Sequence, residues 1–370
     1  MPTTPTVSDP LQAALQRALA EAGGWLPFDR FMALALYAPE GGYYAGGLPK
    51  FGAMPASGSD FVTAPELSPL FGRALAVQVA QALLATDTLD VWEFGAGTGA
   101  LARQVLDALT ADERFESVRY HIVELSGSLR ERQRETLQAH AGRVTWADTW
   151  PARLEGVVLG NEVLDAMPVQ LLHRVGGVWF ERGVVAEGDA WAWGDRPTGL
   201  RPPMEPEGPH DYLTEIHPQA EAFVKSLGGR LARGAAFFID YGFPESEYYH
   251  PQRHMGTLMC HQGHRADGDP LVAVGAKDIT AHVNFTGIAL AAQNAGQQVL
   301  GYATQARFLI NCGLVDLASA ASVAERAQAM KLLHEHEMGE LFKVLAFAPE
   351  ASAGGWEPLG FAQGDRTHTL

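Results

Sequence analysis

The chain has 370 residues, of which 47% are hydrophobic and 19% charged, a composition typical of one large globular domain with insertions or of two domains. A net charge of −16 argues against nonspecific nucleic-acid binding, which needs a basic surface. The two cysteines lie far apart without C-x-x-C spacing, so we expect no disulfide framework and a reducing compartment.

Segments that would target or anchor the protein are not evident. The first ten residues lack a basic stretch followed by an apolar run, so we expect no secretory signal. No apolar stretch reaches the length of about 18 residues that a membrane span requires. These features predict a cytoplasmic protein.

The segment before the first expected sheet strand is mostly helix and loop. Apolar spacing predicts an amphipathic helix over residues 11–22, a short helix over 27–37 and a third over 67–85. A loop rich in Gly, Pro and Ser extends to residue 59, and loops of this length are usually functional or mobile. We interpret residues 1–88 as a helical N-terminal cover with a mobile loop.

Strands and helices alternate from residue 90 onwards, which predicts an α/β protein with a parallel sheet covered on both faces. The expected strands are 90–94, 120–124, 144–146, 156–162, 235–240, 297–302 and 342–347, and the expected helices are 99–110, 127–139, 217–232, 277–294, 304–313 and 321–336. Two segments interrupt the alternation. The first, at about 166–210, is rich in β-hairpin signals, and the second, at about 241–277, is polar. We interpret residues 89–350 as one domain with these two insertions and 351–370 as a C-terminal tail.

The strand at 90–94 runs into a glycine turn that opens a helix. Gly95, Gly97 and Gly99 alternate with other residues in this turn. Such a turn allows a tight backbone path, lets a ligand approach the backbone and leaves the N–H groups of the helix N-terminus free. The pattern is typical of a site for a nucleotide-like ligand.

The spacing leaves two cofactors open. The three glycines suit S-adenosylmethionine, whereas Gly95 and Gly97 followed by Ala100 satisfy the looser dinucleotide pattern. Glu124, at the end of the second strand, would bind ribose hydroxyls in either case.

Three observations favour the methyl donor. Glu93 precedes the glycines, where it could meet the cationic amino group of the donor. Asp148 follows the third strand, at a position where an adenine contact is common in such folds. No Arg or Lys lies within the turn to meet a phosphate.

Polar residues also follow the fourth strand, at the edge of the sheet where ligands bind. Asn161, Glu162 and Asp165 would face the reacting group. Carboxylates can position and polarise a cationic guanidinium through bidentate hydrogen bonds, which methyl transfer to nitrogen requires. The alternative is that Asn161 or Asp165 caps a helix.

Other polar residues indicate less. The His and Cys residues between 250 and 264 are spaced irregularly, so we expect a polar substrate loop there and no metal. Asp240 ends the fifth strand and could face the active site or make structural hydrogen bonds.

With these motifs in place, the chain resembles the MidA family of class I S-adenosylmethionine-dependent methyltransferases. The blocks that carry the resemblance are 30–32, 36–44, 60–72, 93–99, 123–126, 161–168, 240–243, 256–258, 264–265, 278–285 and 338–344. They cover nearly the whole chain in order. One departure is Asn284, where the family often has Asp.

The resemblance implies a seven-stranded, doubly wound, Rossmann-like sheet and S-adenosyl-L-methionine as cofactor, with S-adenosyl-L-homocysteine as product. The expected cofactor residues are Glu93, Gly95, Gly97, Gly99, Glu124 and Asp148. The expected catalytic residues are Glu66, Asn161, Glu162 and Asp165. Glu66 enters through its place in the 60–72 block.

Mitochondrial members of the family resemble protein arginine methyltransferases that act in respiratory complex I assembly. The resemblance therefore implies methyl transfer to an arginine of a protein or peptide, such as a complex I subunit, by a bacterial relative that could form a homodimer. Three alternatives stay open. These are an assembly or binding factor for which methylation is secondary, a small-molecule methyltransferase, and a dinucleotide enzyme.

Overall fold

The computed structural model describes residues 9–45 and 63–370. The expected mobile loop up to residue 59 and the first part of the 60–72 block lie largely outside these ranges.

The largest sheet follows the order β15-β16-β10-β5-β2-β3-β4, with β14 paired to β10 off this path. Its strands are β2 (Asp90–Phe94), β3 (Arg119–Val123), β4 (Val144–Ala147), β5 (Leu154–Asn161), β10 (Leu231–Phe243), β14 (Val283–Asn284), β15 (Gln297–Thr304) and β16 (Phe342–Pro349). The central strands pair in parallel, and β16 runs antiparallel to both β10 and β15. The seven strands of the main path confirm the predicted α/β class.

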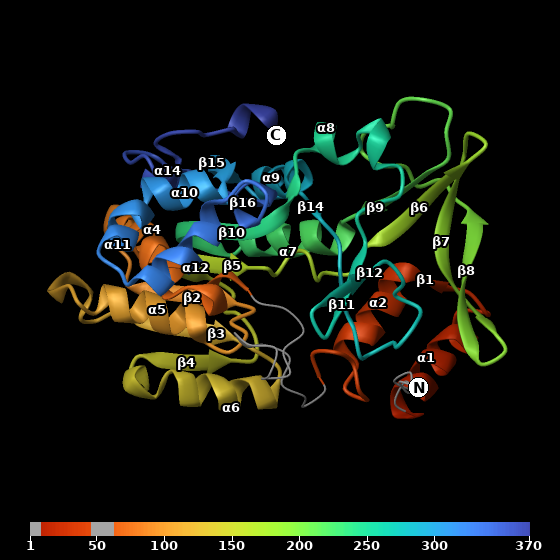
Figure 1. The fold of residues 1–370 in the computed structure, drawn as a ribbon, viewed down its shortest axis with the longest axis horizontal. Coiled ribbons are helices and arrows are strands. Elements are labelled where there is room, and N and C mark those ends of the chain that lie inside the picture. The colour runs from red at the N-terminus through yellow and green to blue at the C-terminus, as the bar shows by residue number, and fades with distance from the viewer. Residues whose placement is uncertain (1–8, 46–62) are drawn as a thin grey trace.

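Helices cover both faces of this sheet (Figure 1). One face is covered by α4 (Pro69–Thr86), α5 (Ala100–Leu109), α10 (Gln305–Asn311), α11 (Leu314–Ser319) and α12 (Val323–Leu333), whose buried side chains share one core with the sheet. Helices α7 (Pro218–Gly228) and α9 (Phe285–Asn294) share a second core on the other face. Helix α6 (Gly127–Thr136) follows β3.

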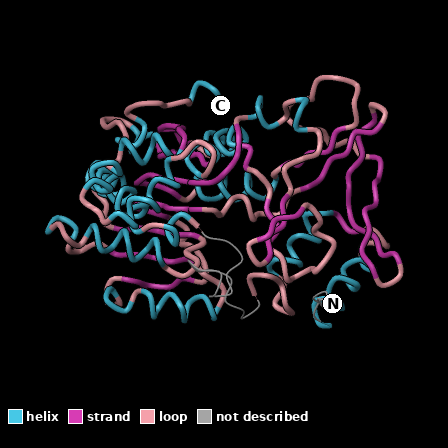
Figure 2. Tube along the Cα trace, viewed as in Figure 1, coloured by secondary structure: helices cyan, strands magenta, loops and turns pink. Residues whose placement is uncertain are grey.

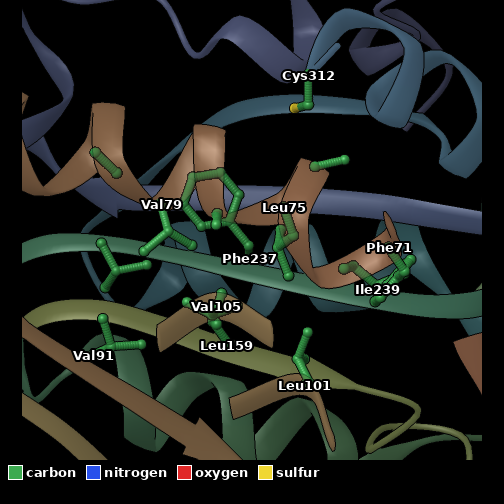
Figure 3. Packing of buried hydrophobic residues seen from close by; sticks show 14 of the residues in the cluster. Phe71, Leu75, Val79, Val91, Leu101, Val105, Leu159, Phe237, Ile239 and Cys312 are labelled. Atoms are coloured by element: carbon green, nitrogen blue, oxygen red, sulfur yellow. The ribbon is translucent and has the colours of Figure 1, made fainter. Parts of the chain in front are cut away.

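Helix α4 is apolar almost all round, which is typical of a helix buried on more than one side. Figure 3 shows Phe71, Leu75 and Val79 of this helix pointing at Phe237 and Ile239 of β10. Fully burying one such side chain stabilises the fold by about 1.5–3 kcal/mol. The helix therefore belongs to the core of the sheet domain, although it precedes the first strand of the main sheet.

A second β-rich half lies beside the main sheet (Figure 2). It contains a five-stranded sheet, β1 (Leu26–Pro27), β6 (Gln170–Val175), β7 (Val178–Glu187), β8 (Ala190–Pro197) and β9 (Tyr212–Ile216), and a three-stranded sheet, β11 (Met259–Gln262), β12 (Arg265–Asp267) and β13 (Asp278–Thr280). Helices α1 (Asp9–Glu21) and α2 (Phe28–Tyr37) share a separate hydrophobic core with these strands. The N-terminal segment is thus divided, because α1 and α2 pack here whereas α4 packs on the main sheet. The boundaries of the cover, the two insertions and the tail stay predictions.

One expected helix is wrong. The segment 277–294 begins with β13 and β14, and only its second part is helical, as α9. Ile279 pairs with Cys260 of β11, so tertiary pairing overrides the helical pattern at this end. The Asn284 side chain accepts the Gly287 amide and caps the shorter helix.

The remaining elements are short. They are α3 (Ala64–Leu67), α8 (Glu245–Tyr248), α13 (Met338–Leu341), α14 (Glu350–Ala353) and the 3-10 turns η2 (Glu113–Phe115), η3 (Gln138–His140), η4 (Pro251–Arg253), η5 (Leu359–Phe361) and η6 (Thr367–Thr369). Among the described residues, no helix combines the length and apolarity that a membrane crossing needs.

A glycine of β10 lies very close to the backbone of β5. Gly234 has φ +124, and a Cβ atom there would lie 1.8 Å from the carbonyl oxygen of Gly156. Neither the backbone angle nor the space accepts a side chain, so the pairing of these strands requires glycine.

We expect Gly234→Ala to lower the free energy of unfolding by more than about 2 kcal/mol, because it combines backbone strain with overpacking. Thermal or urea unfolding measures the loss. Gly199→Ala is the control and should change stability by less than about 0.5 kcal/mol, because nothing lies within 4 Å of its added methyl group. Equal stability of the two variants would contradict the close approach.

Candidate active site

A cavity of about 1120 Å³ lies between the main sheet and the β-rich half. Its walls come from the turn after β2, the segments after β3 and β5, and the end of β10 on one side. Helix α2 and strands β11 and β13 contribute from the other. The site thus sits at the carboxyl ends of parallel strands, where open α/β sheets bind ligands.

Eight of the ten expected site residues line this cavity. They are Glu66, Glu93, Gly95, Gly97, Glu124, Asn161, Glu162 and Asp165. Gly99 and Asp148 are not among the lining residues. The structure therefore brings most of the expected cofactor and catalytic residues together around one volume.

The glycine turn has the backbone form that its sequence predicts. Gly95, Gly97 and Gly99 have φ of +66, +51 and +84, in the region that glycine adopts without strain. A Cβ atom on Gly95 would lie 2.8 Å from Val163 Cγ2. No side chain caps α5, so its first amides have no partner inside the helix. The turn offers a ligand a smooth backbone surface and unpaired donors.

The segment before the main sheet is tied to this turn. The Thr98 hydroxyl donates to the Glu66 carboxylate. The Gln104 amide group donates to the Pro65 carbonyl at 2.7 Å, and its oxygen accepts the Gly72 amide at 3.0 Å. Glu66 therefore lies beside the turn, at the junction of α3 and α5.

Glu124 lines the cavity beside the glycine turn. Its carboxylate accepts the Ser126 amide at 2.8 Å and the Gln133 side-chain amide at 3.3 Å. The same Gln133 nitrogen donates to the Gly97 carbonyl at 3.0 Å, which joins Glu124 to the glycine turn. The next residue, Leu125, is 78% exposed although it lines the cavity, so it offers an apolar surface to a ligand.

Glu93 is deeply buried at the carboxyl end of β2. The Tyr120 hydroxyl donates to its carboxylate at 2.8 Å. Burial raises the pKa of Glu93 to about 7, and this hydrogen bond opposes the rise. The carboxyl is held close to the point at which it gains or loses its proton at neutral pH.

The two residues that miss the cavity do so for different reasons. Gly99 packs towards Leu137 and Gln133. Asp148 is exposed, and its carboxylate pairs with Arg130, whose guanidinium also donates to the Glu124 carbonyl. Asp148 therefore lies outside the cavity wall, and its adenine contact stays a prediction.

The acceptor-side residues follow β5 in a turn and not in a helix. The next regular element after β5 is strand β6, so the alternative that Asn161 or Asp165 caps a helix does not apply. Glu162 adopts φ +53, which is uncommon for a residue with a side chain. The Asn161 side-chain nitrogen donates to the Glu162 carboxyl at 3.0 Å, and the Tyr241 hydroxyl donates to Asp165 Oδ2.

The pKa values of both carboxyls in this turn are raised. Burial, together with the charge of nearby Asp165, raises the pKa of Glu162 to about 8. Burial raises the pKa of Asp165 to about 6, although the Tyr241 hydrogen bond lowers it. Two acids in one poorly solvated region resist ionising together unless a cation joins them.

Several cavity residues were not expected to form the site. They are Tyr37, Tyr44, Tyr241, Asp278, Thr280 and His282. Five lie in the 36–44 and 278–285 blocks of the family resemblance, and Tyr241 follows Asp240 in another, so those blocks were the available signal.

The tyrosines converge on the acidic turn. The Tyr37 hydroxyl donates to the Ala166 carbonyl at 2.8 Å, and the Tyr44 hydroxyl donates to Asp278 Oδ1 at 2.8 Å. The two rings stack with centroids 5.5 Å apart. Aromatic rings beside carboxylates are typical of sites that bind organic cations.

Four buried polar atoms of the cavity wall have no hydrogen-bond partner in the described part of the chain. They are Asn161 Oδ1, Asp165 Oδ1, Thr280 Oγ1 and His282 Nδ1. Burial lowers the pKa of His282 to about 4, so its ring is neutral at pH 7. Because buried polar atoms are nearly always hydrogen-bonded, this group indicates a ligand site with places for N–H donors.

The wall of the cavity is acidic. Six of its described lining residues carry carboxyl groups, namely Glu66, Glu93, Glu124, Glu162, Asp165 and Asp278, and none is Lys or Arg. A phosphate-bearing dinucleotide would find no basic partner among these residues, whereas a cation would be stabilised. Within residues 9–45 and 63–370, no three His, Cys, Asp or Glu side chains converge as metal ligands would.

The fold and the site together define a class I methyltransferase. A family profile for S-adenosyl-L-methionine-dependent methyltransferases, Methyltransf_28, matches residues 74–303, and the chain belongs to this family. It is 51% identical to a COG1565 superfamily member from Burkholderia thailandensis, crystallised with S-adenosyl-homocysteine bound. That match has a TM-score of 0.91 and covers 97% of this chain and 96% of the other.

Curated relatives are more distant. The chain is 28% identical to protein arginine methyltransferase NDUFAF7 of Danio rerio, over 87% of this chain and 83% of the relative. It is 27% identical to the Homo sapiens protein of that name, over 90% and 82% of the two chains.

We expect the raised pKa of Glu162 to make the unliganded protein less stable as pH rises. The unfolded carboxyl ionises near pH 4.3, about the value of free glutamate, whereas the folded one keeps its proton up to about pH 8, so unfolding releases a proton in this window. Glu162→Gln removes this effect. Its stability should therefore exceed that of the wild type by about 1–2 kcal/mol more at pH 8.5 than at pH 5, a range reduced for partial solvent contact.

Thermal unfolding of both proteins between pH 5 and 8.5 measures this difference. If the two curves ran parallel, Glu162 would not carry a raised pKa in the folded protein.

Proposed function

We propose that this protein transfers a methyl group from S-adenosyl-L-methionine to the guanidinium nitrogen of an arginine in a protein or peptide. The observation that carries the proposal is one cavity with the glycine turn in one wall and two acids, the half-buried Glu162 and the buried Asp165, in another. The relatives support each part, because one is crystallised with the product cofactor and others are named protein arginine methyltransferases.

The residues around the glycine turn fit the cofactor. Gly95 and Gly97 would let it approach the backbone, Glu124 would accept its ribose hydroxyls, and Leu125 would cover its adenine. Glu93 would face the amino group, whose positive charge favours the ionised carboxyl. When bound, S-adenosyl-L-methionine supplies an electrophilic methyl group on a cationic sulfur.

The acids at the other end would hold and orient the acceptor. Glu162 and Asp165 would accept guanidinium N–H groups, and the charge of the guanidinium would stabilise their ionised forms. Asn161 Oδ1 and His282 Nδ1 are further unpaired atoms that could accept such donors. The nitrogen loses a proton on methylation, and Glu162, whose pKa lies near 8, is the group suited to take it.

Glu66 would act on the cofactor side of this arrangement. Its carboxylate already accepts the Thr98 hydroxyl beside the glycine turn. We therefore assign it a role in fixing the turn and the methyl donor, and we assign the acceptor to Glu162 and Asp165.

Narrower expectations rest on the resemblance alone. A respiratory complex I subunit as acceptor, and an assembly function in which methylation is secondary, belong to this level. So does a homodimer. A cytoplasmic location rests on the cysteine spacing and stays an expectation. A small-molecule acceptor is the competing reading of the same cavity.

We expect Gly97→Val to abolish cofactor binding, with the affinity for S-adenosyl-L-homocysteine falling at least about 100-fold. A β-branched residue at φ +51 is strained and fills the surface that a ligand would approach. Calorimetry with S-adenosyl-L-homocysteine and with NAD measures the effect. Gly142→Ala, with open space around it, is the control. Tight NAD binding without S-adenosyl-L-homocysteine binding would overturn the proposed cofactor.

We expect Glu162→Gln to reduce methyl transfer at least about 100-fold while S-adenosyl-L-homocysteine binding stays within about twofold. Labelled donor and a bacterial cell extract provide the assay, and mass spectrometry locates the label. Labelled arginine in a protein supports the proposal. A labelled metabolite without labelled protein would replace it with the small-molecule reading.

A further inference from the structure

Asp240 is a buried acid that belongs to the site without lining the cavity. It lies near the end of β10, is fully inaccessible to solvent, and is absent from the lining residues. Its strand pairs in parallel with β5, with Ile239 opposite Asn161. The Glu162 amide donates to the Ile239 carbonyl at 2.9 Å and continues this pairing past the end of β5. Asp240 therefore sits beside the turn that carries the acceptor-side acids.

A single oxygen of Asp240 holds three consecutive amides of that turn. Oδ2 accepts the backbone N–H groups of Val163, Leu164 and Asp165 at 3.2, 2.9 and 3.2 Å. Consecutive amides that point at one centre form a nest, an arrangement that binds anions. Here the anion site of the turn is filled by a side chain of the protein itself.

The nest accounts for the unusual backbone of Glu162. A left-handed conformation is unfavourable for a residue with a side chain. Glu162 adopts it immediately before the three amides whose hydrogen bonds Asp240 Oδ2 accepts. Three hydrogen bonds to one oxygen counteract this strain.

The residue after Asp240 fixes the second acid of the turn. The Tyr241 hydroxyl donates to Asp165 Oδ2, while its ring meets the His282 and Phe342 rings edge-on at centroid distances of 5.2 and 5.3 Å. Asp240 thus holds the backbone of the turn, and Tyr241 holds the Asp165 side chain.

We propose that Asp240 is a positioning residue for the acceptor subsite, which fixes the carboxyls of Glu162 and Asp165 through the three amides without touching the substrate. The inference rests on the proposed function for what the subsite binds. The nest itself is a property of this chain and can be measured without a substrate.

Asp240→Asn tests the inference, because it replaces the carboxyl group that accepts the three amides with a side-chain amide. We expect the Val163, Leu164 and Asp165 amides to exchange with solvent at least about tenfold faster, as followed by NMR. We expect the affinity for the probe N-acetyl-arginine amide, measured with S-adenosyl-L-homocysteine present, to fall at least about tenfold. The affinity for S-adenosyl-L-homocysteine should stay within about twofold.

Glu215→Gln is the matched control. Glu215 is another buried carboxylate, and it accepts the Thr257 and Leu258 amides at 2.8 and 3.1 Å. None of these three residues lines the cavity. Its loss should lower stability to a comparable degree and change neither the exchange of the three amides nor probe affinity. If both variants weakened the probe equally, the effect of Asp240 would be general destabilisation and the inference would be wrong.

The remaining outcomes also decide the question. If the wild type binds no arginine probe, the proposed function fails, but amide exchange in Asp240→Asn still tests the nest. If Asp240→Asn does not fold, the amide exchange of the wild type is measured instead. Slow exchange of the three amides supports the inference, and exchange as fast as that of an exposed turn overturns it.

Discussion

The architecture of the site depends on the parallel pairing of β5 with β10. Gly234 of β10 pairs with Gly156 of β5 and lies too close to its carbonyl oxygen for any side chain. The register places Asn161 beside Ile239 and brings the following turn against Asp240. Strand β2 pairs with the other side of β5, with Phe94 opposite Gly160. This pairing places the acidic turn beside the glycine turn.

The two ends of the cavity come from different parts of the molecule. The main sheet supplies the glycine turn, Glu124 and the acidic turn after β5. The β-rich half supplies Tyr37, Tyr44 and the residues of β13. Methyl transfer requires two ligands to be held in line, and a cavity between two halves allows each wall to recognise one of them. The hydrogen bond from the Tyr37 hydroxyl to the Ala166 carbonyl joins these walls.

How far the sequence predicts the site depends on how local each feature is. The glycine turn and Glu124 follow directly from a strand, a turn and a helix that are adjacent in the chain. The acidic turn required only the rule that ligands bind at strand ends. The position of a residue after a strand predicts where its backbone lies, however, and not where its side chain points. Asp148 could therefore be expected near the adenine, although Arg130 holds it at the surface.

Features that depend on distant pairing could not be predicted in this way. The helix expected over 277–294 begins as a strand because β11, some twenty residues earlier, offers it a partner. The same pairing brings Asp278, Thr280 and His282 into the cavity. Tyr44 reaches Asp278 across 234 residues of sequence. No periodicity within one segment carries that information, whereas the family-like blocks mark these segments without stating their contacts.

The unbalanced charge of the cavity connects its structure with its chemistry. Burying carboxylates without basic partners is costly, and burial accordingly raises the pKa values of Glu93, Glu162 and Asp165. Both proposed ligands carry positive charge, in the sulfonium and amino groups of the donor and in the guanidinium of the acceptor. A cation that enters therefore competes with protons for the same carboxyls. The acidity of the cavity wall thus favours the binding of both ligands, and it disfavours neutral or anionic molecules of similar size.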